Sequence, residues 1–269
     1  MPRSDEKKVE LFQAWITVNG NRLPEYDPQY DPDTNTWTCW IPSEVGQRFV
    51  VHWRNFGKRA TTGAYVYVDG EFADGKLLMK DNAAQSTFVN GKRTASATIA
   101  RFYFQPIVLT DEENPFLLED DNTVNSIGEM KVIINKGRNA GIAAYRHGTV
   151  KPARAVNERA KKAGAHRVQY ADEVNDTDDI GAMFRPDQAT MPLTFIFKYR
   201  PKDMLQAMGI IARGEAIGGF GRTSGSAGER ERGLKEEPDI KRERSESPPA
   251  ESSTAHRRKR TRSTVKAEE

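Results

Sequence analysis

Short apolar segments with alternating side chains are the feature that most constrains the fold of this chain. Phe49, Val51 and Trp53 fall on one face of an extended segment. An alternation of this kind is typical of a β-strand with one buried face. Asn19-Gly20 and Asp69-Gly70 are typical tight-turn pairs between such segments. The pattern therefore favours many short strands joined by turns.

The other segments of this kind are apolar, β-branched or aromatic and are bounded by Gly, Pro or Asn. Strands are predicted at 11–18, 37–41, 47–55, 64–68, 97–104, 107–109, 131–135 and 193–199. Two segments rich in helix-forming residues, 153–163 and 203–212, each follow a proline and are predicted to be helices. The fold class predicted is mainly β, an antiparallel β-sandwich with one or two peripheral helices.

The composition changes sharply after residue 212. Residues 213–269 hold ten apolar side chains, five of them Ala, among Gly, Ser, Glu and Arg. Such a segment cannot bury enough apolar surface to offset its ordering entropy, so it is predicted to be a disordered C-terminal tail. We expect a flexible N-terminus at 1–9, a β-sandwich domain with a C-terminal helix at 10–212, and the tail at 213–269.

Charge and cysteine content limit the class of protein. Residues 1–212 carry 27 basic and 27 acidic side chains, and the net charge of +3 lies in the tail. The domain is therefore not globally basic, as a typical DNA-binding domain would be. Cys39 is the single cysteine, which fits a reducing compartment. The polar start has no signal-peptide core, and no apolar run approaches membrane-spanning length, so we expect no membrane partner.

Several segments of the domain resemble a family of uncharacterised fungal proteins that carry a domain of unknown function. The segments are AWITV at 14–18, CWIPSEVGQRF at 39–49, YVDG at 67–70, FIFKYR at 195–200 and LQAMGII at 205–211. The resemblance spans about residues 10–212. It implies a fungal origin and a folded domain followed by a disordered basic tail, and it implies no reaction and no functional residues.

Three lysines of the tail share one local pattern of an aliphatic residue, the lysine, any residue and glutamate. The sequences are Leu234-Lys235-Glu236-Glu237, Ile240-Lys241-Arg242-Glu243 and Val265-Lys266-Ala267-Glu268. Lys259 and the 13 lysines between Lys7 and Lys202 lack it. The pattern resembles the acceptor sequence for a small ubiquitin-like modifier, in which the lysine amine acts as a nucleophile in the conjugating enzyme. A modifier-conjugating enzyme is therefore an expected partner, and chance matches in a Glu-rich tail are the alternative.

A basic run in the same tail predicts nuclear localisation. It comprises Arg257, Arg258, Lys259, Arg260 and Arg262. Short runs of Lys and Arg bind import receptors or nucleic acid, and a solvated charged tail is the simpler alternative. A nuclear import receptor is the second expected partner. Ser247, which precedes Pro248, is a candidate phosphorylation site.

Residues 130–168 form a second basic segment, with ten cations and one acid, Glu158. The candidate nucleic-acid contacts are Lys131, Lys136, Arg138, Arg146, Lys151, Arg154, Arg159, Lys161, Lys162 and Arg167. Phosphate contacts of this kind would make binding salt-dependent. Acidic stretches flank the segment at 111–121 and 172–179, so its charges could instead be paired within the fold.

The sequence gives little support for a catalytic or metal-binding site. The four histidines are scattered, Cys39 lies in a Trp-rich strand, and no spacing proposes a catalytic triad. The acidic run 176–179 lacks the ligand alternation and the final Glu of a calcium loop. We therefore expect no catalytic residues, no metal and no cofactor.

These observations together predict a non-enzymatic nuclear protein that binds an unidentified protein partner, at chromatin, through its domain. The tail would be regulated by modifier conjugation. The alternative is a nucleic-acid-binding module that uses residues 130–168 and the tail, and an enzyme of unknown reaction is the third possibility.

Overall fold

The computed structural model describes residues 11–57, 60–80, 86–111, 118–143, 148–160, 164–176 and 181–212. The chain divides into two units, 1–217 and 218–269, and all described residues belong to the first. The predicted tail at 213–269 and the predicted flexible segment at 1–9 lie outside the described residues. Within those residues, no helix has the length and apolar character needed to cross a bilayer.

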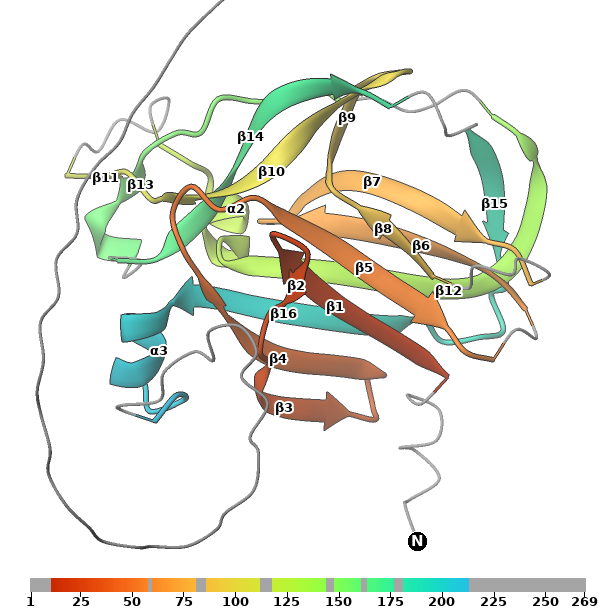
Figure 1. The fold of residues 1–269 in the computed structure, drawn as a ribbon, viewed down its shortest axis with the longest axis horizontal. Coiled ribbons are helices and arrows are strands. Elements are labelled where there is room, and N and C mark those ends of the chain that lie inside the picture. Colours follow the sequence, from red (N-terminus) through yellow and green to blue (C-terminus); the bar gives the residue numbers. More distant parts are fainter. Residues whose placement is uncertain are drawn as a thin grey trace, which may run out of the picture. The chain divides into compact units, whose positions relative to one another are not determined.

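A seven-stranded sheet forms the larger layer of the domain (Figure 1). Its main path runs β3-β4-β16-β12-β6-β7, and β15 pairs with the distal part of β12. The strands are β3 (Tyr26–Asp31), β4 (Thr36–Ser43), β6 (Thr61–Val68), β7 (Glu71–Leu78), β12 (Glu129–Ile142), β15 (Ala182–Pro186) and β16 (Leu193–Pro201).

Two smaller sheets form the second layer, which lies against one face of the first (Figure 1). One has the order β2-β1-β5-β8 and the other the order β14-β10-β9. The strands are β1 (Phe12–Val18), β2 (Asn21–Arg22), β5 (Phe49–Asn55), β8 (Ser86–Val89), β9 (Gly91–Ala95), β10 (Thr98–Pro106) and β14 (His166–Asn175). A bridge between Arg48 and Tyr103, and the hydrogen bond from Phe104 N to Gln47 O (3.1 Å), join the two sheets.

The main core fills the space between the layers. Alternate residues of β1, β5, β6, β12 and β16 contribute to it, and Phe49, Val51 and Trp53 are at most 1 % exposed, as their spacing predicts. The aromatic ring of Phe49 stacks on those of Phe102 and Phe104, which belong to β10. The interdigitated side chains thus bind the β14-β10-β9 sheet to the rest of the sandwich.

The predicted mainly-β fold is confirmed, and its strand pairing is mixed. Most pairs are antiparallel, but β4 and β16 pair in parallel over their full lengths, from Thr36 opposite Thr194 to Ser43 opposite Pro201. The short strands β11 (Leu109–Thr110) and β13 (Val156–Asn157) also pair in parallel.

Two short α-helices within the described residues lie at the periphery of the domain. α2 (Asp121–Ser126) is capped at its N-terminus by Asp120, whose carboxylate accepts hydrogen bonds from Thr123 N (3.0 Å) and Thr123 Oγ1 (2.7 Å). α3 (Lys202–Ala207) is the predicted C-terminal helix, and it ends earlier than expected because Gly209 adopts a left-handed conformation (φ 75°). Leu205 is buried where α3 contacts β4 and β16, Ile211 is also buried, and Met208 is half exposed.

The helix predicted over 153–163 is wrong for the residues that the structure describes. Residues 156–157 form β13 and residues 158–160 form a 3₁₀ turn, η1 (Glu158–Ala160), while 161–163 lie outside the described part of the chain. Val156 is fully buried against Val124 and Ile127, and its N–H donates to Val108 O (2.8 Å). This tertiary contact overrides the helical propensity of the flanking Ala, Arg and Glu residues.

Candidate functional site

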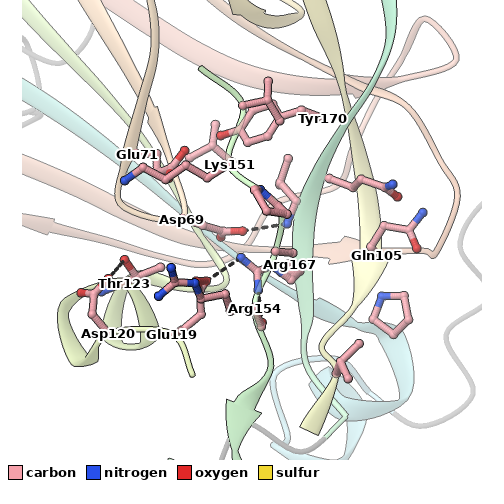
Figure 2. Close-up of a pocket in the computed structure, with 18 residues that line it drawn as sticks. Asp69, Glu71, Gln105, Glu119, Asp120, Thr123, Lys151, Arg154, Arg167 and Tyr170 are labelled. Atoms are coloured by element: carbon pink, nitrogen blue, oxygen red, sulfur yellow. Dashed lines mark hydrogen bonds and ion pairs between the residues drawn. The ribbon is translucent and has the colours of Figure 1, made fainter. Parts of the chain in front are cut away.

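A pocket of about 640 Å³ opens where β6, β10 and β14 meet the start of α2 (Figure 2). The segment 150–154 forms one wall, and residues 167–170 of β14 form another. We call this cavity the end pocket. Four acidic and three basic side chains line it: Asp69, Glu71, Glu119, Asp120, Lys151, Arg154 and Arg167.

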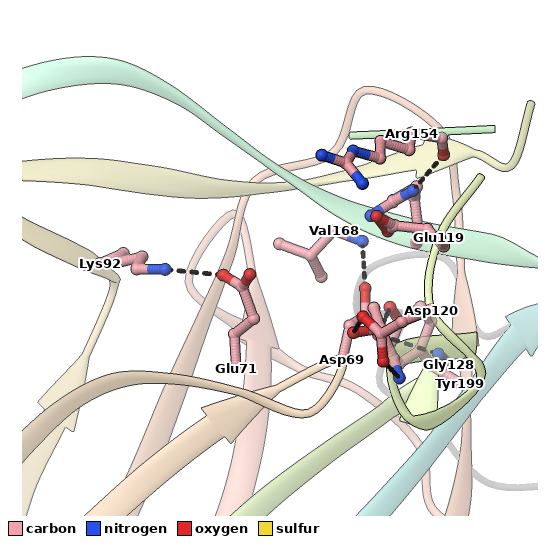
Figure 3. Close-up of polar contacts among 11 residues, drawn as sticks. Asp69, Glu71, Lys92, Glu119, Asp120, Gly128, Arg154, Val168 and Tyr199 are labelled. Carbon is pink, nitrogen blue, oxygen red and sulfur yellow. Dashed lines mark hydrogen bonds and ion pairs between the residues drawn. The ribbon is translucent and has the colours of Figure 1, made fainter. Parts of the chain in front are cut away.

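Asp69 connects four separate parts of the chain at the floor of the end pocket (Figure 3). Its carboxylate accepts hydrogen bonds from Tyr199 Oη (2.5 Å), Gly128 N (2.8 Å) and Val168 N (2.7 Å). Asp69 and Gly70 form the tight turn between β6 and β7, both with positive φ, as the sequence predicts. The carboxylate thereby joins this turn to the start of β12, to β14 and to β16.

Burial raises the pKa values of the two acidic groups at this junction, Asp69 and Tyr199. Desolvation raises the pKa of Asp69 from its usual value, and the three hydrogen bonds oppose that effect. Burial and the nearby Asp69 charge raise the pKa of Tyr199 well above its usual value, so its hydroxyl remains a donor. Three donors surround one carboxylate, which therefore has few lone pairs left for a substrate or a metal.

Gly128 is required for the geometry of the same junction. Its φ is +87°, and a Cβ placed there would lie 1.8 Å from Nη1 of Arg200. That guanidinium donates to the carbonyl oxygens of Gly128 (3.2 Å) and Tyr199 (2.7 Å). Arg200 therefore occupies the space that a side chain at 128 would need.

An ion pair between Arg167 and Glu119 lies at the wall of the end pocket. The Arg167 guanidinium donates to Glu119 Oε2 (2.8 Å) and to the backbone oxygen of Arg154 (2.9 Å). The two charged side chains are only 11 % and 12 % exposed. The ion pair links β14 to Glu119, which lies two residues before α2. The hydrogen bond to the Arg154 carbonyl fixes the segment that carries Arg154.

A third ion pair, Lys92–Glu71, lies at another wall of the end pocket. Lys92 Nζ, from β9, lies 2.6 Å from Glu71 Oε2 at the start of β7 (Figure 3). The same Nζ lies 5.2 Å from the ring centroid of Tyr170. Burial raises the pKa of Tyr170, so its phenol is neutral at physiological pH.

The remaining cations of the end pocket, Lys151 and Arg154, are exposed. No acidic side chain among the described residues pairs with either of them. Val108, Val150 and Pro152 add apolar surface beside them. This combination suits an extended peptide with an acidic and an aliphatic side chain, since the deeper charges already have partners.

The structure divides the predicted nucleic-acid contacts among several places. Lys151, Arg154 and Arg167 line the end pocket, while Lys131 and Lys136 lie on β12 beside two other cavities. Arg138 lies farther along β12 and Arg159 lies in η1. Arg146, Lys161 and Lys162 lie outside the described residues.

The acidic flanks neutralise part of this basic segment. Arg167 pairs with Glu119 of the preceding acidic stretch, as the alternative interpretation of the sequence anticipates. The residues of the tail, Lys235, Lys241, Lys266, Ser247 and the basic run at 257–262, all lie outside the described residues.

One serine and one histidine, distant in sequence, meet inside the domain. Ser43 Oγ lies 2.9 Å from His166 Nδ1, and the two residues are 7 % and 8 % exposed. Burial lowers the pKa of His166, against a smaller opposing effect of Asp203. Their contact links β4 to β14. Because both side chains are buried, neither is accessible to a substrate in this conformation.

Metal-binding clusters are likewise missing from the part of the chain that the structure describes, where no three His, Cys, Asp or Glu side chains gather. Cys39 is fully buried in the main core, as its strand context predicts. Burial raises the pKa of its thiol to about 12, so the reactive thiolate is suppressed.

Residues 12–214 match the model of a protein family described as a domain of unknown function, DUF7918. The chain belongs to this family. The match covers the same region as the β-sandwich and the end pocket. No curated protein and no solved structure shows a significant match to the chain.

Proposed function

We propose that this DUF7918 protein is a non-enzymatic nuclear module that binds a protein partner at chromatin through its sandwich domain. Its tail carries acceptor lysines for a small ubiquitin-like modifier. The observation that carries the proposal is the acceptor pattern at Lys235, Lys241 and Lys266, which the fourth tail lysine, Lys259, lacks. A fungal source belongs to the same proposal, on the strength of the resemblance described above.

The basic run at 257–262 supports the nuclear part of the proposal, because such runs bind import receptors. The modifier machinery acts largely in the nucleus, so the two signals agree. A predicted disordered tail suits both, since an extended chain can enter an enzyme cleft or a receptor groove.

The end pocket supports the binding part of the proposal. Its buried charges are engaged in Arg167–Glu119, Lys92–Glu71 and the Asp69 junction. A general acid or base must have a free hydrogen-bonding position that faces the substrate. The paired groups of the end pocket have few such positions left. The exposed Lys151 and Arg154 remain available to an acidic segment of a partner.

The test of the tail is a denaturing pull-down of the full chain from fungal cells, blotted for the modifier. We expect shifted bands that disappear when Lys235, Lys241 and Lys266 are replaced by Arg. Replacing Glu237, Glu243 and Glu268 by Gln keeps the lysines and should also abolish the bands, because the carboxylate is part of the pattern.

Lys259→Arg is the matched control, since it changes a tail lysine outside the pattern and keeps its charge. Unchanged modification in the triple lysine variant would contradict the acceptor assignment. For import, replacing the five cations of the basic run by Gln should move a fluorescent fusion to the cytoplasm. Nuclear retention of that variant would remove the import signal from the proposal.

The test of the end pocket compares Lys151→Glu/Arg154→Glu with Lys136→Glu/Arg138→Glu, a charge reversal of equal size on β12. Proteins cross-linked to the wild-type chain should be lost from the first variant and kept by the second. Equal loss from both variants would show that general basic charge, and not the end pocket, holds the partner.

A further inference from the structure

A cavity of about 360 Å³ lies beside β12, farther along the strand than the end pocket. Three of its lining residues, Phe12, Ile134 and Leu193, belong to the main core. Two further apolar lining residues are exposed, Leu11 at 40 % and Met191 at 56 %. The cavity therefore provides an apolar path from solvent to the edge of the main core. We call it the side pocket.

Lys136 is the one charged side chain among the described residues that line the side pocket. It is exposed, and no acidic side chain in the described part of the chain pairs with it. The carboxylate of Asp187, the acidic residue whose N–H donates to Lys136 O (2.8 Å), instead accepts a hydrogen bond from Ala189 N (3.0 Å). The Lys136 ammonium is thus available to an anion that enters the side pocket.

Two arginines lie directly opposite each other on the strand pair that continues from the side pocket. Arg138 of β12 is the cross-strand partner of Arg185 of β15, and both are exposed. Because alternate residues of a strand share a face, both lie on the same face as Lys136. Neither has an acidic partner within the described residues. Like charges directly opposite each other destabilise a strand pair, and an anion bound between them would remove that repulsion.

Phe184 fixes the orientation of β15 that produces this arginine pair. Its ring lies over Gly63 and Gly137, where an added Cβ would in each case be 2.6 Å from a ring carbon. Successive side chains of a strand point to opposite faces, so Arg185 points away from Phe184 and toward the face that carries Lys136. The two glycines therefore permit the close approach that places three cations on one face.

We propose that the side pocket and the arginine pair form one binding site for a single-chain lipid with a phosphate head group. The alkyl chain packs against Ile134, Leu193 and Met191. The head group binds Lys136, Arg138 and Arg185, since guanidinium groups pair with phosphate oxygens in a bidentate manner. Four residues of a strand span about 13 Å, so an extended decyl chain can reach from the arginine pair to Ile134.

The chemistry of the side pocket fits a small amphipathic ligand. Sites for small molecules are mostly apolar, contain a few fixed polar groups and have volumes of about 300–1,000 Å³. The proposed site lies apart from the end pocket and does not rest on the function proposed for it. The simpler interpretation is that solvent screens the exposed arginines and that water fills the side pocket. Such a surface would bind an alkyl phosphate no better than inorganic phosphate.

The experiment is isothermal titration calorimetry of the full chain with n-decyl phosphate, at concentrations below those at which it forms micelles. Inorganic phosphate has the charge without the chain, and n-decyl glucoside has the chain without the charge. We expect the Kd of decyl phosphate to be at least about tenfold lower than that of either, because only decyl phosphate engages both parts of the site.

Two variants test the two parts of the site. Arg138→Gln/Arg185→Gln should raise the Kd of decyl phosphate at least about tenfold, since it removes charge-assisted hydrogen bonds. It should also unfold at an equal or higher temperature than the wild type, because the repulsion between the arginines is gone. Met191→Glu should raise the Kd by about tenfold as well, since it places a negative charge beside the alkyl chain.

Each variant has a matched control at a distant position. Lys151→Gln/Arg154→Gln neutralises two exposed cations of the end pocket, and Met208→Glu changes a methionine of similar exposure (48 %) after α3. Both should bind decyl phosphate as the wild type does. Thermal unfolding confirms that every variant is folded.

Four results would overturn the proposal. They are no binding of decyl phosphate by the wild type, equal affinity for inorganic phosphate, unchanged affinity in the Arg138→Gln/Arg185→Gln variant, and equal losses in the controls. Binding to phosphatidylcholine vesicles that contain phosphatidate, without binding to monomeric decyl phosphate, would assign the cations to a membrane surface and would overturn it too.

Discussion

The end pocket differs in internal organisation from the aromatic row, which comprises Trp15, His52 and Phe88 on the outer face of the β2-β1-β5-β8 sheet. In the end pocket, Asp69, Arg167 and Glu71 are held by partners from other elements of the fold. In the aromatic row, the Trp15 and His52 rings stack face to face, and cations lie over the Trp15 and Phe88 rings. Hydrogen bonds and ion pairs thus hold the floor of the end pocket together, whereas ring stacking and cation–π contacts join the strands of the row.

The largest expected effect comes from breaking the Asp69 junction. Asp69→Ala leaves the Tyr199 hydroxyl and the N–H groups of Gly128 and Val168 buried without their acceptor. We expect the free energy of unfolding to fall by roughly 3–5 kcal/mol, measured by urea denaturation. Asp33→Ala, at an exposed position, serves as the control. A loss below about 1 kcal/mol would show that Asp69 is not the structural centre of the end pocket.

Breaking the Arg167–Glu119 pair should have the next largest effect. Arg167→Met leaves Glu119 poorly solvated and should cost roughly 2–3 kcal/mol of unfolding free energy. A double-mutant cycle with Glu119→Gln should give a coupling energy of about 1 kcal/mol or more. The same cycle at the exposed Arg22–Glu25 pair should give less, because solvent screens that contact. Equal couplings would remove the distinction between the two surfaces.

A smaller effect should appear in the pH dependence of stability. Burial raises the folded-state pKa of Asp69 above its unfolded value, so the folded state binds more protons between those two values. The contribution of Asp69 to the unfolding free energy is therefore greatest at acid pH and falls as pH rises through the folded-state pKa. The stability difference between wild type and Asp69→Asn should shrink from pH 4 to pH 7 in urea titrations. A difference that grows over this range would mean that hydrogen bonding outweighs burial.

The smallest effect on stability is expected in the aromatic row. Phe88 is half exposed, so Phe88→Ala should lower the unfolding free energy by about 1 kcal/mol or less, the size of one cross-strand contact. Urea denaturation of the variant and the wild type measures this loss. A loss as large as that of Asp69→Ala would show that the row is as important to stability as the Asp69 junction.

The sequence predicts the central strands well because their side chains alternate. Strands β1, β5, β6 and β16 each bury one face in the main core, and hydrophobic periodicity reflects that burial directly. Strand β14 was not predicted because its sequence, HRVQYADEVN, is largely polar. A bulge, at which Asp172 has a positive φ, also interrupts its alternation. The polar strands β3 and β9 were missed for the same reason.

The candidate site was harder to predict than the fold. Asp69-Gly70 is recognisable as a turn, but turn residues are usually exposed and nothing in the local sequence indicates a buried junction. Its partners Gly128, Val168 and Tyr199 are 59 to 130 residues away. The aromatic row likewise depends on the register between β1, β5 and β8, which the sequence alone does not supply.

The parallel pairing of β4 with β16 has a consequence for how the protein is made. β16 lies between β4 and β12 in the seven-stranded sheet, although it is the last of the described strands to be synthesised. A nascent chain that ends before residue 193 has a gap at the centre of this sheet, with apolar faces of β4 and β12 uncovered. The sandwich can therefore close only after the C-terminal strand has emerged from the ribosome. Until then, the uncovered apolar faces and unpaired strand edges make the nascent chain prone to aggregation.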